Sequence, residues 1–229
     1  MRVAFLSEGA TELAFAPGAR VDEAWRHDFL LKIIVERILD AEGRIEPLED
    51  ERLPYLVGNP AGRLCRSAAP FVRECTLRGA DAAVVVVDRD RGEPRRRLRA
   101  LIDQRERLRH DPNRPLAVPM AVGVAVETVE AWLLADEMRL CEVLGLSHPD
   151  QPMGSPEQLS GKPGEPDHPK SVLNAYFARD ADGSREFLDR VVALGRMMDL
   201  DVVARRCPQG FAHFRDDVLA ELGPHFGRA

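Results

Sequence analysis

The sequence is short of cysteine, of aromatic residues and of lysine, and each shortage excludes something. Its four cysteines, Cys65, Cys75, Cys141 and Cys207, form no CxxC pair and no metal-ligand spacing with histidine, so neither a disulfide framework nor a zinc site is expected. Aromatic residues make up 6% of the chain, so the core has to be built mostly from Val, Leu, Ala and Ile. Lysine is so scarce that nearly every cation is an arginine, whose side chain suits phosphate contacts.

Long apolar runs and a net positive charge are also missing. No apolar stretch reaches membrane-spanning length, and Met1 leads directly into a charged residue without a signal-peptide pattern, so a cytoplasmic location is expected. The net charge of −6 supplies no global basic field, so any contact with nucleic acid has to come from a local patch. What is present, 229 residues of which 45% are hydrophobic and 31% charged, suits one large domain with a real core.

Strand-like and helix-like segments alternate through the first part of the chain. The expected strands are 2–6, 44–48, 82–87 and 116–126, and the expected helices are 21–41, 63–78, 94–109 and 128–144. The run 82–87 (AAVVVV) lacks polar alternation, which is typical of a central parallel strand covered on both faces. The sequence therefore predicts an α/β fold with an open, mainly parallel sheet and helices on both faces.

The rest of the chain has a different pattern. Residues 148–169 are rich in Pro, Gly and Ser and predict a loop or linker. Helical patterns follow at 170–178, 184–198 and 211–222. We therefore expect an α/β domain over residues 1–147 and a C-terminal helical region, 170–229, packed on it.

Acidic residues follow two of the expected strands. Glu8 comes after the first strand and Glu12 lies one helical turn further on, so both can face the same point. Asp88 and Asp90 follow the 82–87 strand, and in extended chain residues i and i+2 point the same way. Ligands of open α/β sheets lie beyond the carboxyl ends of the strands. Hard oxygen ligands of this kind suit Mg²⁺ or Mn²⁺.

Each acidic segment also has a plainer interpretation. The acids of segment 8–12 fit a helix N-terminus, where negative charge meets the helix dipole, and Asp-x-Asp fits a solvated turn. Their joint position at the ends of two buried strands favours a functional site, because four crowded carboxylates repel one another unless a cation lies among them. A third acid is ambiguous: Glu127 ends an expected strand and Glu130 begins the next helix, so either can complete the cluster.

Two segments carry a resemblance to known proteins. A Glu-Gly after the first strand and an Asp-x-Asp after a later hydrophobic strand resemble Toprim-fold proteins, and segment 8–12 (EGATE) looks most like the nucleases of the OLD type (overcoming lysogenization defect). Segment 127–136 (ETVEAWLLAD) resembles a bacterial branch of Toprim-like proteins, which also tends to have a Pro-Lys pair, here 169–170, and a Phe-x-x-Phe, here 211–214. Within it, Trp132, Leu133 and Leu134 are expected in the core.

The resemblance implies roles for individual residues. Glu8 would be a metal ligand or the general acid/base, while Glu12, Asp88 and Asp90 would be metal ligands. The resemblance favours Glu130 as the third acid, whereas the position at a strand end favours Glu127. The ATPase module of OLD-type proteins has no counterpart, because no GxxxxGK[ST] motif occurs.

Basic residues lie close to the acidic ones in sequence. Phosphate oxygens commonly bridge a metal and arginine in phosphoryl transfer, so the arginines that follow the Asp-x-Asp are candidate nucleic-acid contacts: Arg89, Arg91, Arg95 and Arg96. A solvated helix face is the alternative. Lys170 is a candidate catalytic residue that would stabilise developing negative charge, with an exposed loop lysine as the alternative.

Three functions fit these patterns. The leading hypothesis is a Mg²⁺- or Mn²⁺-dependent phosphodiesterase, a nuclease acting on DNA or RNA in phage defence or DNA repair. The second is a non-catalytic Toprim-like regulatory or binding partner of a separate ATPase. The third is a phosphatase-like or receiver-like domain, which the late position of the Asp-x-Asp disfavours, since haloacid-dehalogenase phosphatases carry theirs on the first strand.

Overall fold

Four parallel strands form the sheet at the centre of the molecule. The computed structural model describes residues 2–7, 29–40, 48–52, 75–76, 78–89, 93–113, 115–147, 149, 153–179 and 187–226. The strands are β1 (Arg2–Ser7), β2 (Glu49–Arg52), β3 (Ala82–Asp88) and β4 (Met120–Ala125). They pair in the order β2-β1-β3-β4, and each pair is parallel. The prediction of an α/β fold with an open parallel sheet is confirmed.

β3 is the central strand that its sequence predicts. It lies between β1 and β4, and residues 82–87 have no exposed surface. Because side chains alternate across a strand, Val84 and Val86 join the core cluster on one face of the sheet, while Val85 and Val87 join the cluster on the other. A run without polar residues is required here because both faces are buried.

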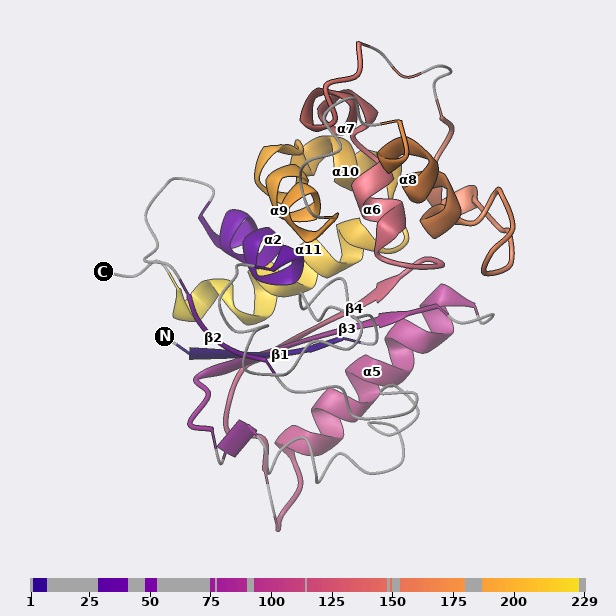
Figure 1. Cartoon of the computed structure of the whole chain (residues 1–229). Helices are drawn as coiled ribbons and strands as arrows, with labels where there is room; N and C mark the ends of the chain where they lie inside the picture. The colour runs from indigo at the N-terminus through magenta and orange to yellow at the C-terminus, as the bar shows by residue number, and fades with distance from the viewer. Residues whose placement is uncertain are drawn as a thin grey trace.

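Helices cover both faces of the sheet, but unequally (Figure 1). The helices on the upper side are α2 (Leu30–Leu39), α6 (Glu130–Leu134), α7 (Glu137–Val143), α8 (Pro169–Phe177), α9 (Phe187–Met197), α10 (Leu200–Arg206) and α11 (Phe211–Glu221). Two 3-10 turns, η1 (Pro156–Gln158) and η2 (Gly223–His225), accompany them. On the lower side lies α5 (Pro94–Arg109). Side chains of α2, α9 and α11 share one core cluster with β1, β3 and β4, so the C-terminal helices complete the main core.

α5 follows from its sequence. Pro94 occupies the first helical turn, where its missing N–H costs nothing. Leu101 and Leu108, two turns apart, are buried against the sheet together with Val85 and Val122, and the remaining positions are mostly polar. The helix therefore presents one apolar stripe to the sheet and an arginine-rich face to solvent.

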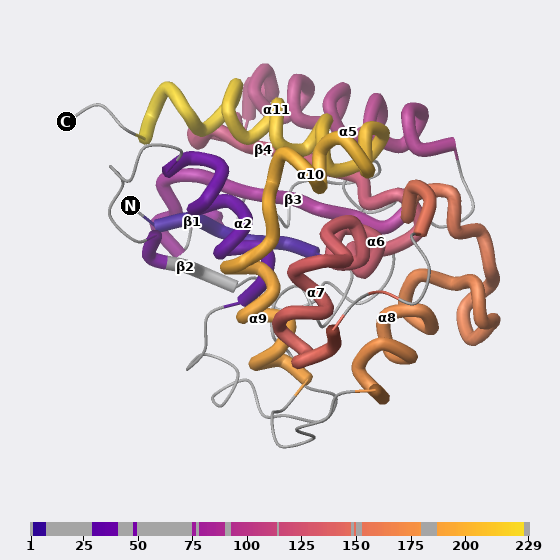
Figure 2. Tube along the Cα trace, turned by 90° about the horizontal axis from the view of Figure 1, so that it is seen from above, coloured from indigo at the N-terminus to yellow at the C-terminus, as the bar shows by residue number. Residues whose placement is uncertain are grey.

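α11 runs beside β4, the edge strand on this side of the sheet (Figure 2). Gly123 permits the close approach, because a Cβ there would lie 2.7 Å from Cδ2 of Phe214. Two side chains satisfy backbone groups of the edge: Val122 N–H donates to Asp217 Oδ2 over 2.7 Å, and Arg105 Nη1 donates to the Met120 carbonyl over 2.9 Å. Arg105 and Asp217 also pair with each other over 2.7 Å, so the edge of β4 is closed by an ion pair instead of a strand.

Several boundaries differ from the sequence expectation. The helix expected over 128–144 is two helices, because Asp136 leaves the helical conformation and its carboxylate accepts the Arg139 N–H as the N-cap of α7. The strand expected from residue 116 begins at Met120, directly after Pro119, which has no N–H to pair. Of the strand expected at 44–48, residues 44–47 lie outside the described residues, and β2 is described at Glu49–Arg52. Most of the helix expected at 63–78 lies outside the described residues.

α10 is a helix that the sequence pattern did not predict. Its segment contains adjacent valines, which disfavour helix. It forms because the Asp199 carboxylate accepts the N–H groups of Asp201 and Val202 and so caps its first turn.

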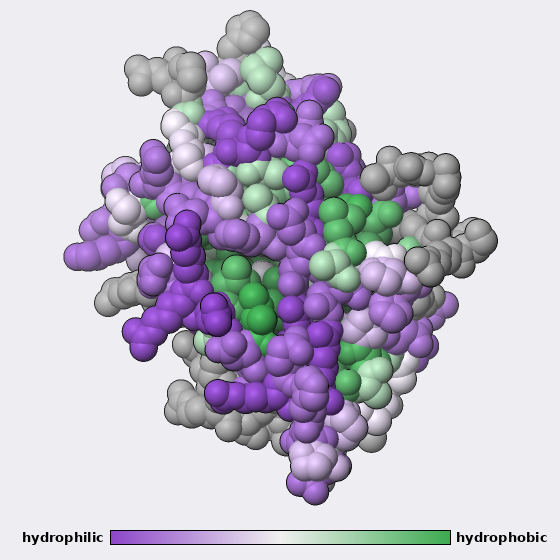
Figure 3. Space-filling view, turned by 180° about the vertical axis from the view of Figure 1, so that it is seen from behind, coloured by the Kyte–Doolittle hydropathy of each residue, from purple (hydrophilic) through white to green (hydrophobic). Residues whose placement is uncertain are grey.

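In the part of the chain that the structure describes, no helix is long and apolar enough to cross a membrane. The rear face is mainly hydrophilic, with hydrophobic residues reaching the surface in separate patches (Figure 3).

Candidate functional site

The carboxyl ends of three neighbouring strands meet at one edge of the sheet. Ser7 at the end of β1 pairs with Val86 of β3, and Asp88 at the end of β3 pairs with Ala125 at the end of β4. The parallel register thus brings the residue after each strand to the same edge. Asp88 is half-buried there, and Glu127 lies two residues beyond β4.

Four of the predicted site residues are not placed. Glu8, which directly follows Ser7 in the sequence, lies outside the described residues, as do Glu12, Asp90 and Arg91. Their predicted roles as metal ligands, general acid/base and phosphate contact therefore stay predictions.

Glu127 has an unusual backbone. Its φ is +63°, and the Thr128 N–H donates to the Val126 carbonyl over 3.1 Å, so Glu127 is the middle residue of a γ-turn in the left-handed region. Non-glycine residues adopt this conformation at a cost of about 1–3 kcal/mol, and such residues cluster at functional sites. The turn ends β4 abruptly and leaves the Glu127 carboxylate 15% exposed at the sheet edge.

Arg89 holds this carboxylate. The Arg89 guanidinium forms an ion pair with Glu127, and its own side chain is only 24% exposed. Its Nε is buried and has no hydrogen-bond partner among the described residues. Arg89 thus joins the end of β3 to Glu127, two residues beyond β4. Its predicted contact with phosphate stays a prediction.

Glu130 occupies a different environment. It is 5% exposed in the first turn of α6, where a carboxylate favours the helix dipole. The Thr128 hydroxyl nearby in the sequence is buried, and its Oγ1 has no hydrogen-bond partner in the described part of the chain. The two candidates for the third acid are thus separated by the structure: Glu127 at the open edge and Glu130 in the packed helix start.

The described residues alone do not form a metal site. Among them, no group of three or more His, Cys, Asp or Glu side chains lies close enough to hold a metal ion. Of the predicted ligands, this covers Asp88, Glu127 and Glu130. Carboxylate oxygens at a strand edge are the right donors for Mg²⁺ or Mn²⁺, but a complete set would need Glu8, Glu12 or Asp90.

Glu157 is a buried acid near this edge that the sequence analysis missed. Its carboxylate accepts the Gln209 N–H over 2.9 Å and the Gly210 N–H over 2.6 Å, just before α11. Burial raises the pKa of Glu157, against the opposing pull of these N–H groups, of His213 and of Arg89. No motif marks Glu157, because its partners lie some fifty residues away along the chain.

Gly210 makes room for this arrangement. A Cβ at position 210 would lie 2.9 Å from Glu157 Oε1, 2.9 Å from the Val124 carbonyl oxygen and 3.2 Å from Trp132 Nε1. Glu157, the Val124 carbonyl in β4 and the Trp132 indole therefore surround the space that a side chain at position 210 would occupy. Glu157 ties η1 to the segment that begins α11.

The segment 130–136 is a packing unit. Trp132, Leu133 and Leu134 have no exposed surface, which confirms the expectation that they belong to the core. The Trp132 ring contacts Phe211 edge-on at 5.3 Å and stacks on Phe214 at 5.4 Å between centroids. The Trp132 side chain of the EAWLLAD segment thus packs α6 against α11.

Lys170 lies in the first turn of α8. Its side chain is exposed there, and its backbone N–H donates to His168 Nδ1 over 3.3 Å. Its predicted catalytic role stays a prediction of the sequence.

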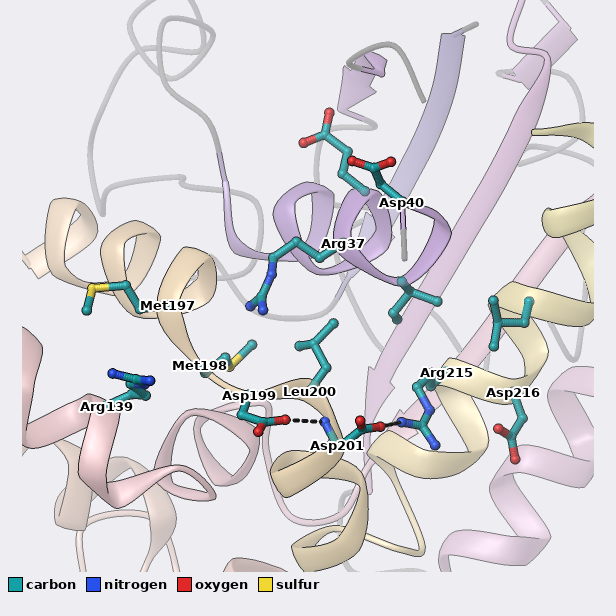
Figure 4. A pocket seen from close by; sticks show the side chains of 13 residues that line it. Arg37, Asp40, Arg139, Met197, Met198, Asp199, Leu200, Asp201, Arg215 and Asp216 are labelled. Atoms are coloured by element: carbon teal, nitrogen blue, oxygen red, sulfur yellow. Dashed lines mark hydrogen bonds and ion pairs between the residues drawn. The ribbon is translucent and has the colours of Figure 1, made fainter. Parts of the chain in front are cut away.

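A groove of about 1020 Å³ lies elsewhere, between α2, α7, α9, α10 and α11 (Figure 4). Its charged side chains are engaged with one another and with the backbone: Arg215 Nη1 donates to Asp201 Oδ1 over 2.7 Å, and Arg37 Nη1 donates to the Gly195 carbonyl over 2.8 Å. None of the described site candidates lines it. We therefore assign the groove to the junction between helices and not to the chemistry.

The exposed arginines predicted for phosphate contact lie at the start of α5. Arg95 and Arg96 are both exposed in its first turn, on the helix that begins shortly after β3 ends.

Comparison of the chain with protein-family models, with curated proteins and with solved structures finds no match.

Proposed function

We propose that this chain is a divalent-metal-dependent phosphodiesterase that cleaves DNA or RNA on a Toprim-like sheet. One observation carries the proposal: Asp88 ends β3 and Glu127 lies two residues beyond β4, the adjacent parallel strand, while β3 also pairs with β1, which Glu8 follows in sequence. Acids from separate strands that gather at one sheet edge are the arrangement expected of a hard-cation site.

Under the proposal, each residue has a task. Asp88, Glu127, Glu8, Glu12 and Asp90 hold the cation, which when bound activates a water molecule and neutralises charge on the scissile phosphate. Glu127 takes the third position because its γ-turn places it at the carboxyl end of the sheet, whereas Glu130 is buried in the first turn of α6.

Arg89 is a positioning residue in this scheme. A carboxylate has about four lone-pair sites, so the guanidinium can fix Glu127 and leave oxygen lone pairs for a cation. Arg91, Arg95 and Arg96 are proposed to contact the phosphodiester backbone. Phage defence or DNA repair is the proposed setting.

Cleavage of a labelled oligonucleotide with Mn²⁺ or Mg²⁺ tests the proposal. We expect Asp88→Asn and Glu127→Gln each to lower the cleavage rate at least a hundredfold, with Asp216→Asn, an exposed acid on α11, as the matched control. Glu130→Gln separates the two candidates for the third acid, since it should retain activity if Glu127 is the ligand. Full activity of Asp88→Asn would refute the site.

A non-catalytic partner of a separate ATPase is the second candidate. The ion pair with Arg89 favours it, because the guanidinium neutralises Glu127 without any metal ion. The 229 residues contain no P-loop motif, and under this candidate the ATPase is proposed to be a separate chain. Copurification of an ATPase with the tagged protein, together with no metal-dependent cleavage, would support this candidate over the first.

A further inference from the structure

The outer face of α5 carries a stripe of exposed arginines. Four arginines are exposed: Arg95, Arg96, Arg99 and Arg107. The first two precede Arg99 by four and three residues, and Asp103 lies four residues from both Arg99 and Arg107. Residues at these spacings lie on one face of a helix. From Arg95 to Arg107 the stripe extends about 18 Å, at a rise of 1.5 Å per residue.

Among the described residues, little neutralises this stripe. Asp103 lies within it, and its contact with Arg99 is 3.8 Å long between side chains that are 82% and 56% exposed. An ion pair that exposed contributes little. Glu106, three residues beyond Asp103, pairs with Arg105 and Arg109, which lie outside the stripe. Four exposed arginines against these two acids stand out in a chain whose net charge is −6.

The position of the stripe on the helix is unfavourable for the protein alone. Arg95 and Arg96 lie in the first turn of α5, which contains no acid, and the N-cap residue Glu93 makes no side-chain cap hydrogen bond. The N-terminus of a helix carries partial positive charge, so cations there destabilise the helix. A polyanion lying across the first turn would remove this repulsion.

We propose that the outer face of α5 is a binding track for the phosphodiester backbone of a nucleic-acid strand, leading to the carboxyl edge of the sheet. The track rests on the proposed function for its destination and extends it with two residues, Arg99 and Arg107. Its length matches about five nucleotides at 3.4 Å per nucleotide along one strand.

The chemistry of α5 distinguishes nucleic acid from an anionic membrane. Helices that lie on membranes insert a face with large apolar side chains beside the basic one. The apolar face of α5 is buried against the sheet through Leu101 and Leu108. Of the large apolar side chains that the structure describes, the exposed ones are Met138, Met197 and Leu219, none of them on α5.

The test is binding of a fluorescein-labelled 30-nucleotide DNA, single-stranded and as a duplex, in EDTA at a series of salt concentrations. The slope of log K against log salt is negative, and each lost phosphate contact reduces its magnitude by about 0.7 for single strands and about 0.9 for duplex. We expect Arg99→Ser/Arg107→Ser and Arg95→Ser/Arg96→Ser each to reduce this magnitude by roughly 1.4 to 1.8. The form that binds more tightly identifies the strand state that the track accepts.

The control removes the same charge elsewhere: Arg139→Ser/Arg205→Ser, exposed on α7 and α10, should keep the wild-type slope. Circular dichroism confirms folding of all variants. Equal slopes for the α5 variants and the wild type, absence of binding by the wild type, or charge-dependent binding to phosphatidylserine vesicles but not to DNA would each overturn the track. Because EDTA removes metals, loss of binding in the α5 variants supports the track even if no variant or wild type cleaves DNA.

Discussion

Arginines of α5 stand in two opposite settings. On the side toward α11, Arg105 is buried and pairs with Asp217 and Glu221, while Arg109 pairs with Glu221 and Glu106, so these arginines join α5 to α11. On the outer face, the arginines at 95, 96, 99 and 107 are exposed. An arginine-rich window in a sequence is therefore not one patch, because partners from distant segments decide which cations remain available.

The largest expected effect comes from a buried arginine. Arg105→Met leaves Asp217 as a buried acid without its cation and leaves the Met120 carbonyl without this donor, so we expect a loss of about 3–5 kcal/mol in the free energy of unfolding. Urea unfolding measures it. The matched control is Arg107→Met, two residues along the same helix and exposed, which should change stability by less than about 0.5 kcal/mol. Equal losses in the two variants would end the distinction between the buried and the exposed arginines.

Double-mutant cycles sharpen the comparison at the level of pairs. For Arg105 with Asp217, where burial excludes water from a 2.7 Å contact, we expect a coupling energy of about 1–3 kcal/mol. For Arg99 with Asp103, an exposed pair four residues apart on one helix, we expect about 0.2–0.5 kcal/mol. A larger coupling at the exposed pair would contradict the assignment.

The pH dependence of stability should also report on the buried pair of Arg105 and Asp217. Burial raises the pKa of Asp217 despite its bonds to Val122 N–H and Arg105, so the folded state keeps the proton to higher pH than the unfolded state does. The contribution of this group to stability therefore falls as the pH rises from below the ordinary value, about 3.9, through the raised one. In urea titrations between pH 3 and pH 7, as an order-of-magnitude window around that value, the advantage of wild type over Asp217→Asn should shrink as the pH rises. An advantage that grows as the pH rises would contradict this sign.

The smallest effect has the opposite sign. Arg95→Glu replaces a cation by an acid at the helix N-terminus and adds a Glu-to-Arg pair with Arg99, four residues on, so we expect a gain of about 0.3–1 kcal/mol in stability. The same change should weaken DNA binding in the salt series. Thermal unfolding measures the gain, and Arg107→Glu, the same change in the last turn of α5, serves as a substitution with no predicted gain. A loss of stability in Arg95→Glu would show that the first turn is not under electrostatic strain.

The sequence predicted what depends on neighbours along the chain. The apolar run 82–87 predicts β3, because a strand that is buried on both faces requires an uninterrupted apolar sequence. Asp88 follows this run at the carboxyl end of the strand, as expected. Trp132 in the core was predictable for the same reason. The predicted ligands Glu8, Glu12 and Asp90 lie outside the described residues and stay predictions.

What was missed depends on contacts between distant segments. Glu157 becomes a buried acceptor only because Gln209 and Gly210 approach it, and Arg105 is structural only because Asp217 and Glu221 lie opposite. Nothing within a window around either residue carries that information. The left-handed backbone of Glu127 was hidden in the same way, since the residue type gives no sign of it.

Closure of β4 by α11 has a consequence for how the chain matures. The Met120 carbonyl accepts from Arg105, and the Val122 N–H donates to Asp217. Asp217 belongs to α11, which begins at Phe211 and is therefore synthesised long after β4. Until that helix docks, the emerging strand has open backbone groups that can recruit a strand from another molecule. A nascent or truncated chain without α11 would therefore be the form most in need of chaperone protection.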